Sequence, residues 1–146
     1  MPNLVAIAYK TVKRGPMKEV LCANVTQRSG IEKDVLGRPG KRQITVLSKP
    51  QWLIACEEVK TDLPWTTRRA NLLIDGITFS AKDVGKQLHI GELCLEITGE
   101  TDPCDKMEMA CPGLEAALTP DWRGGVTCRV LNDAMIHQGD SVILIG

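Results

Sequence analysis

One of the six cysteines in this sequence has the surroundings of a reactive thiol. Cys104 follows Pro103, is flanked by Asp102, Asp105 and Lys106, and comes just after an alternating apolar stretch that is typical of a strand. A thiol in a polar loop at a strand end can reach a ligand, and a thiolate is both a nucleophile and a ligand for soft or high-valent metals. We therefore take Cys104 as the candidate for thiol or metal chemistry.

The other cysteines are expected to be structural, with one ambiguous case. Four of them occupy apolar or strand-like positions, where a free cysteine behaves as a small hydrophobic side chain: Cys22, Cys56, Cys94 and Cys128. Cys111 precedes Pro112, and the sequence leaves open whether it forms a redox pair with Cys104. No Cys-x-x-Cys pair occurs, so structural zinc and thioredoxin-type redox sites lack their signature.

Arginines and one asparagine lie where predicted strands begin or where loops enter them. Arg68 and Arg69 precede Asn71, which begins a predicted strand. Arg42 ends a polar, glycine-containing loop, and Arg123 precedes the glycines at the start of a predicted strand. Guanidinium groups bind phosphate in bidentate geometry, and an asparagine amide can bind the amide edge of a ring. Each residue also has a purely structural interpretation, as a surface ion pair or as a side chain that satisfies its own backbone.

Charge is distributed unevenly along a chain whose formal net charge is zero. Residues 1–43 contain nine Lys/Arg and three Asp/Glu, whereas residues 76–146 contain five Lys/Arg and eleven Asp/Glu. Either the two halves attract each other across the fold, or the basic half faces an anionic small ligand. The zero net charge and the 3% aromatic content argue against a nucleic-acid partner.

The pattern of apolar residues predicts seven or eight strands and two or three helices. A helix is expected from Ser48 as its N-cap, with Pro50 in its first turn, to about residue 60, and two short helices are expected within residues 103–118. Residues 28–42 form a long polar loop. The predicted strands cover residues 4–10, 18–26, 43–47, 71–75, 87–90, 92–98, 125–131 and 141–145.

These elements show no regular alternation of strand and helix, which favours a mainly β fold. We predict a closed or nearly closed, mostly antiparallel β-barrel with two or three short helical insertions, formed by residues 1–146 as a single domain. The chain opens with no signal-peptide pattern and contains no apolar run long enough to span a bilayer. We therefore expect a cytoplasmic protein with reduced cysteines and no membrane partner.

Taken in order, several segments resemble the MOSC domain, the C-terminal domain of molybdenum cofactor sulfurases that also occurs as small free-standing bacterial proteins. The resemblance runs from about residue 20 to the C-terminus and is strongest over residues 68–104, which include an Arg-x-Asn segment and Cys104. The matching segments are residues 30–34, 42–47, 68–76, 84–91, 95–104, 123–126 and 136–142.

The resemblance implies a β-barrel that binds a pyranopterin molybdenum cofactor or a sulfur species for its maturation. Cys104 matches the key cysteine of the family, as the protein thiolate on molybdenum or as a persulfide carrier. Arg69 and Asn71 match the segment that would contact the phosphate or the pterin. Weaker candidates of the same kind are Arg42, Arg68 and Arg123. Asp34 and Asp140 also match family positions, where we expect them to fix loops and turns.

The leading functional hypothesis is a molybdenum-dependent oxidoreductase that reduces N-hydroxylated or similar small compounds, with electrons from a separate flavin or iron–sulfur protein. The first alternative is a non-redox sulfur or cofactor carrier that uses a Cys104 persulfide. The second is a binding module that kept the barrel and lost the cofactor. It stays open because Lys33 stands where the family often has glycine, and because the residues after Asp34 lack the histidine often found there.

Overall fold

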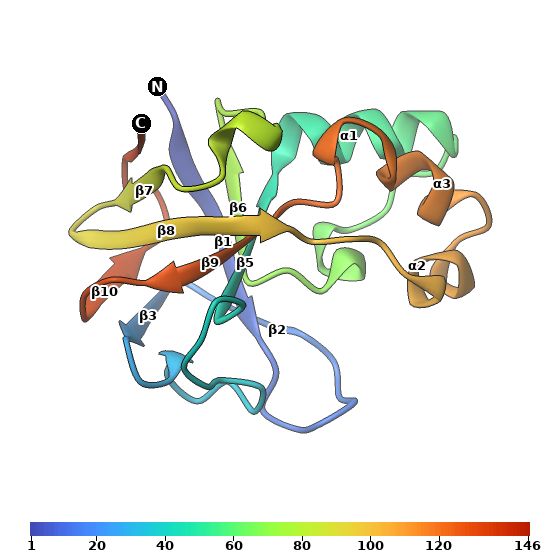
Figure 1. Ribbon diagram of the computed structural model, residues 1–146. Helices are drawn as coiled ribbons and strands as arrows, with labels where there is room; N and C mark the ends of the chain where they lie inside the picture. Colours follow the sequence, from blue (N-terminus) through green and yellow to red (C-terminus); the bar gives the residue numbers. More distant parts are fainter.

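The computed structural model describes all 146 residues, and its main feature is a strongly curved eight-stranded sheet (Figure 1). Across this sheet the strands follow the order β11 (Val142–Ile145), β7 (Gln87–Ile90), β8 (Leu93–Glu100), β9 (Val126–Val130), β5 (Ile44–Ser48), β6 (Leu72–Asp75), β1 (Asn3–Tyr9) and β2 (Lys18–Val20). A smaller sheet contains β10 (Ala134–His137), β3 (Cys22–Thr26) and β4 (Gly30–Ile31). The helices are α1 (Lys49–Glu58), α2 (Asp105–Ala110) and α3 (Leu114–Leu118), with 3-10 turns η1 (Trp65–Arg68), η2 (Ala81–Asp83) and η3 (Pro120–Trp122).

The large sheet curls through 234° and forms a half-barrel. An isolated bridge between Asn3 and Ser141 links the start of β1 to the segment before β11, and the Leu4 N–H donates to the Asp140 carbonyl at 2.8 Å. All strand pairs except β5–β6 are antiparallel. The prediction of a mainly β, mostly antiparallel barrel with short helical insertions is confirmed.

Two details of the strand prediction differ from the structure. The stretch predicted as one strand over residues 18–26 is two strands, because the chain breaks at Leu21 and passes from one sheet to the other. The strand β10 was not predicted, since only Ile136 among its four residues is buried and no apolar alternation marks it. It forms because it pairs along its whole length with β3.

The single parallel pair explains where the candidate residues meet. The chain leaves β5 through α1, whose first turn is capped by the Ser48 hydroxyl as predicted, and returns through η1 to β6. Two parallel strands begin at the same edge of a sheet, and β1, which is antiparallel to β6, ends at that edge. The starts of β5 and β6 and the end of β1 therefore lie together.

These three central strands are held by apolar packing on both faces. Alternation along the strands points Val46 and Leu72 into the half-barrel, where a cluster of 21 buried residues forms the main core. It points Leu47 and Leu73 outward into a second cluster of 13 buried residues beneath the helices, which gather on one side of the sheet (Figure 1). The edge where β1 ends is thus built on a rigid support. None of the helices has the length and apolar character that a bilayer crossing requires.

Candidate functional site

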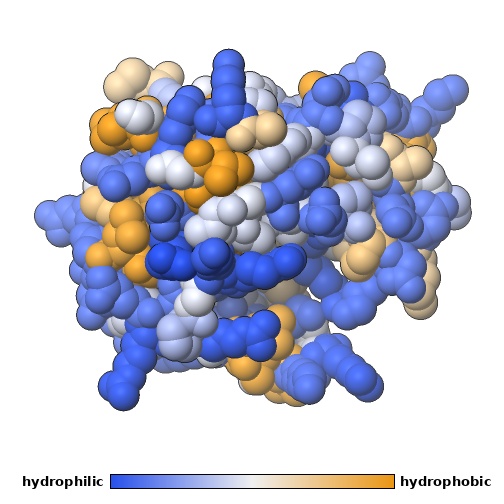
Figure 2. Space-filling view, in the orientation of Figure 1, coloured by the Kyte–Doolittle hydropathy of each residue, from blue (hydrophilic) through white to orange (hydrophobic).

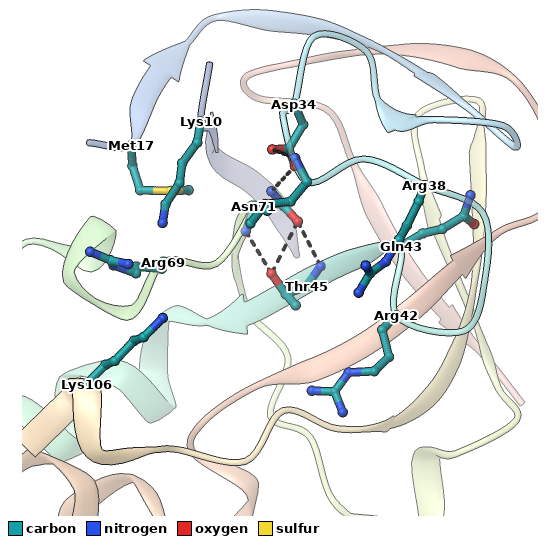
Figure 3. A pocket seen from close by; sticks show the side chains of 11 residues that line it. Lys10, Met17, Asp34, Arg38, Arg42, Gln43, Thr45, Arg69, Asn71 and Lys106 are labelled. Carbon is teal, nitrogen blue, oxygen red and sulfur yellow. Dashed lines mark hydrogen bonds between the residues drawn. The ribbon is translucent and has the colours of Figure 1, made fainter. Parts of the chain in front are cut away.

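A cavity of about 290 Å³ opens at the edge where β1 ends and β5 and β6 begin (Figure 3). The loop over residues 32–42 borders it, and α2 contributes Lys106. Eleven residues line it: Lys10, Met17, Asp34, Leu36, Arg38, Arg42, Gln43, Thr45, Arg69, Asn71 and Lys106. Three of the residues predicted from the sequence to contact a cofactor, Arg42, Arg69 and Asn71, lie in this lining.

Asn71 forms the floor of the cavity, and both polar atoms of its amide have protein partners. Its Oδ1 accepts hydrogen bonds from the Thr45 backbone N–H at 3.1 Å and from the Thr45 hydroxyl at 3.3 Å. Its Nδ2 donates to the Ala8 carbonyl at 3.2 Å and to Asp34 Oδ2 at 3.3 Å. One buried side chain therefore joins β1, β5, β6 and the loop over residues 32–42.

Positive charge dominates the lining. Five cationic side chains face a single carboxylate, that of Asp34, and none of the five forms an ion pair within the protein: Lys10, Arg38, Arg42, Arg69 and Lys106. Burial lowers the pKa of Lys10, the neighbouring Arg69 and Lys106 lower it further, and Asp34 opposes them. An anion bound here would relieve this repulsion, so the charge of the lining is complementary to that of an anion.

The cations come from segments that meet only in the folded chain. In Figure 3, Lys10, Arg69 and Lys106 lie on one side of Asn71, and Arg38 and Arg42 lie on the other. Hydrophilic side chains predominate at the lower end of the face in Figure 2, where the loops over residues 11–17 and 32–42 lie in Figure 1. Three of the basic residues in the segment 1–43, Lys10, Arg38 and Arg42, line the cavity at this end.

The loop over residues 32–42 is held in place by backbone contacts. The Val35 N–H donates to the Lys10 carbonyl at 2.8 Å, and Asp34 Oδ1 accepts from the Leu36 N–H at 3.2 Å. Lys33 has a φ of 75°, in the left-handed region that costs a non-glycine residue roughly 1–2 kcal/mol. This conformation accounts for the glycine that the resemblance associates with the position. Lys33 adopts the same conformation, and the loop still brings Asp34 to Asn71.

Arg68 lies outside the lining, and its guanidinium is used by the protein. It is 6% exposed, and it donates through Nε to the Gly124 carbonyl at 3.0 Å and through Nη2 to the Thr101 and Asp102 carbonyls at 2.9 and 3.4 Å. Burial lowers the pKa of Arg68, and nearby Cys104 and Asp102 oppose that change. Arg68 therefore fixes the segment that leads to Cys104.

The two glycines beside Arg68 leave no room for a side chain. A Cβ on Gly124 would lie 2.4 Å from the Thr101 carbonyl oxygen, and one on Gly125 would lie 2.5 Å from the Val46 carbonyl oxygen. The Thr101 N–H also donates to the Gly125 carbonyl at 2.9 Å. Close backbone approach thus holds the Cys104 segment against the two glycines at the start of β9, and Gly125 in turn against the middle of β5.

Arg123, the second predicted arginine outside the lining, links two helices. It forms an ion pair with Glu58 of α1 at 2.8 Å and donates to the Ala117 carbonyl of α3 at 3.0 Å. Asp121 lies 3.7 Å from the same guanidinium. Its contacts are therefore with the helical layer and not with the cavity.

Cys104 is an exposed free thiol at the N-cap of α2, two residues before Lys106 of the cavity lining. Cys111 is buried at the other end of α2, and a helical rise over seven residues separates the two by roughly 10 Å. A disulfide requires Cα atoms within about 7 Å, so the two cysteines do not pair while α2 is formed. The question that the sequence left open is thereby answered.

Three cations of the lining were not singled out in the sequence: Lys10, Arg38 and Lys106. The surplus of positive charge in residues 1–43 was the available signal for the first two, and proximity to Cys104 was the signal for the third. No group of three or more His, Cys, Asp or Glu side chains is arranged to hold a metal ion.

Comparison with known proteins agrees with the resemblance seen in the sequence. The family model described as the MOSC domain matches residues 21–143. The YuaD protein from Bacillus subtilis has a similar structure, with a TM-score of 0.80 at 16% identity over 99% of this chain and 96% of that one. YiiM from Geobacillus stearothermophilus gives a TM-score of 0.76 at 18% identity over 100% and 76%, and YiiM from Escherichia coli gives 0.73 at 16% identity over 100% and 70%. No curated protein matches the sequence significantly.

Proposed function

Because this chain belongs to the MOSC domain family, we propose that it binds the molybdenum cofactor in the cationic cavity, with the Cys104 thiolate as the protein ligand of molybdenum. The observation that carries this proposal is the set of five unpaired cations around one cavity, with an exposed thiol two residues from the last of them. The roles of the individual residues follow from their contacts.

The charge and size of the cavity fit the anionic end of such a cofactor. Phosphate bears about two negative charges near neutral pH, and Arg38, Arg42 and Arg69 offer fork-shaped donors that match its oxygens. A cavity of about 290 Å³ is near the lower limit of small-molecule sites, so the rest of a pyranopterin would extend toward the surface. Cys104, which is exposed and lies two residues before Lys106 of the lining, would contact that part of the cofactor.

The segment around Cys104 suits a residue that must hold a fixed position while exposed. Arg68 anchors the carbonyls of Thr101 and Asp102 from the protein side. Lys106 and Arg68 add positive charge near the thiol, where an anionic cofactor would lie. In this proposal Cys104 binds the metal, the cavity cations bind the phosphate, and Asn71 keeps the floor in place.

We further propose that the protein acts as an oxidoreductase on N-hydroxylated or similar small compounds. When bound, the molybdenum cofactor supplies two-electron oxygen-atom exchange. The chain itself contributes binding, orientation and charge, and a separate flavin or iron–sulfur protein would supply the electrons. The open position of Cys104 leaves one side of the site accessible to a small substrate.

A second candidate function is supported by the exposure of Cys104. A thiol that lies outside the lining of the cavity is also accessible to a partner, as a sulfur carrier with a persulfide requires. Mass spectrometry after incubation with a cysteine desulfurase and cysteine tests this role. A sulfur adduct confined to Cys104 would support it, and an unmodified Cys104 would count against it.

Metal analysis of protein produced in cofactor-competent cells tests the main proposal. We expect molybdenum in the wild type and strongly reduced molybdenum in Cys104→Ser and Arg42→Ala. Arg129→Ala is the matched control, because Arg129 pairs with Glu96 on the sheet, outside the cavity lining, and should retain the metal. A wild type without molybdenum would refute cofactor binding and would leave the interpretation as a binding module that has lost the cofactor.

A further inference from the structure

A second cavity adjoins the first and shares two of its cations. It has a volume of about 540 Å³ and is lined by Arg14, Thr67, Arg69, Lys106, Met107, Met109 and Ala110. Arg69 and Lys106 line both cavities, so a ligand held between them has access to either side. In Figure 3 these two side chains lie on the same side of the first cavity, together with Lys10.

The second cavity contains cations and no carboxylate. Arg14, Arg69 and Lys106 form no ion pair within the protein, although 18 acidic residues are present in the chain. Thr67 adds a hydroxyl, which donates readily to an anionic oxygen. This composition suits a phosphate group.

Both arginines of this cavity adopt a backbone conformation that is costly for a residue with a side chain. Arg14 has a φ of 63° and Arg69 a φ of 66°, in the left-handed region that glycine or asparagine occupies with less strain. Residues held in unfavourable backbone conformations cluster at binding sites. Here the two strained positions carry the two guanidinium groups of one cavity.

The α2 side of the cavity is apolar and adaptable. Met107 is buried, whereas Met109 is 83% exposed, so its thioether is open to a ligand on this side of the cavity. Thioethers pack well against aromatic rings, and Ala110 leaves space beside them. The cavity therefore offers cations for a phosphate and a thioether surface for a flat ring.

We propose that this second cavity is a subsite for a nucleotide, with the phosphate at Arg14, Arg69 and Lys106 and the base against the methionines. Two sources have this chemistry: a cofactor extended by a nucleotide through a diphosphate, or a separate nucleotide that enters as substrate. Only the first source rests on the proposed function.

Calorimetric titration of the full chain from cofactor-deficient cells tests the subsite with GMP, guanosine and inorganic phosphate as probes. We expect GMP to bind at least tenfold more tightly than either of the others. Arg14→Asn removes the charge, and asparagine tolerates the left-handed backbone. This variant should lower the affinity for GMP by about tenfold, the effect of losing one charge-assisted hydrogen bond. Met109→Glu, at an exposed position, should also lower the affinity for GMP, because the new carboxylate repels the phosphate. Arg42→Ala, which affects the first cavity only, should leave GMP binding within about twofold of wild type.

The cofactor-loaded protein distinguishes the two sources. Release of one nucleoside monophosphate per molybdenum on acid hydrolysis identifies an extended cofactor, whereas binding of added GMP without such release identifies a separate nucleotide. The proposal is overturned if GMP binds no better than guanosine, or if Arg14→Asn and Met109→Glu leave its affinity unchanged. It is also overturned if the loaded protein neither releases a nucleotide nor binds GMP, because GMP would then have occupied the first cavity. Failure of the wild type to load molybdenum would refute the proposed function and leave the titrations fully informative.

Discussion

Asn71 and Thr45 form reciprocal hydrogen bonds at the point where β5 and β6 begin. The Thr45 N–H and hydroxyl both donate to Asn71 Oδ1, and the Asn71 N–H donates back to the Thr45 hydroxyl at 3.1 Å. The remaining amide hydrogens bind Ala8 and Asp34. The floor of the cationic cavity is thus a polar network that depends on one side chain.

Asn71→Ala should lower the free energy of unfolding by roughly 2–4 kcal/mol, because it leaves the Thr45 N–H and the Ala8 carbonyl without partners in a buried place. Urea denaturation measures the change. Asn24→Ala is the control, since Asn24 makes one exposed hydrogen bond to Glu32 and should cost less than about 1 kcal/mol. Equal losses in the two variants would show that the network does not support the floor.

Arg68→Lys should destabilise the protein by roughly 2–3 kcal/mol, although it keeps the charge, because an ammonium cannot reach the Gly124 and Thr101 carbonyls in the same fork. It should also change the alkylation rate of Cys104, measured peptide by peptide, because the segment before the thiol loses its anchor. Arg129→Lys, at a half-exposed ion pair, should change neither quantity. An unaltered Cys104 rate in Arg68→Lys would contradict the positioning role.

Burial, Arg69 and Lys106 lower the pKa of Lys10, so Lys10 should lose its proton at a pH below the ordinary lysine pKa of about 10.4. Anion binding should therefore weaken as the pH rises toward that value. Over the same range the unfolded chain holds more protons than the folded one, so the free energy of unfolding should gain a contribution from Lys10 that increases with pH. Titration with sulfate, whose charge is constant there, isolates the protein's contribution. Lys10→Met should flatten both profiles, and unchanged profiles would show that Lys10 does not titrate in the cavity.

Gly125→Ala should be far more destabilising than Gly139→Ala. Both glycines have positive φ, 100° and 95°, so each substitution carries the left-handed cost of roughly 1–2 kcal/mol. Only at Gly125 would the new Cβ also meet a backbone atom, the Val46 carbonyl oxygen, whereas no atom lies within 4 Å at Gly139. A melting temperature of Gly125→Ala equal to that of Gly139→Ala would contradict the close approach of Gly125 to Val46.

Local signals were sufficient for much of the fold and for part of the site. Ser48 and Pro50 mark the start of α1, and alternating apolar residues mark β7 and β8. The polar context of Cys104 indicated an exposed thiol, as found. Each of these features is determined by residues that are close in the sequence, so it can be predicted from the sequence alone.

The sequence does not show which distant groups bind each cationic side chain. Arg68 and Arg69 are adjacent and look equivalent in the sequence. The left-handed turn at Arg69 places its side chain in the cavity lining, whereas Arg68 is buried against the carbonyls of Gly124 and Thr101, more than 30 residues away. Lys10 and Lys106, which are 96 residues apart in the chain, meet only because the end of β1 and α2 border the same cavity.

X-ray absorption at the molybdenum edge tests the central claim most directly, because it counts the sulfur neighbours of the metal. Wild type and Cys104→Ser are compared in samples that contain equal concentrations of bound molybdenum, which requires more of the variant because it retains less metal. We predict one sulfur neighbour fewer in Cys104→Ser, with the Asn71 floor and the surrounding cations unchanged. Identical sulfur shells in the two proteins would contradict the assignment of Cys104 as the metal ligand.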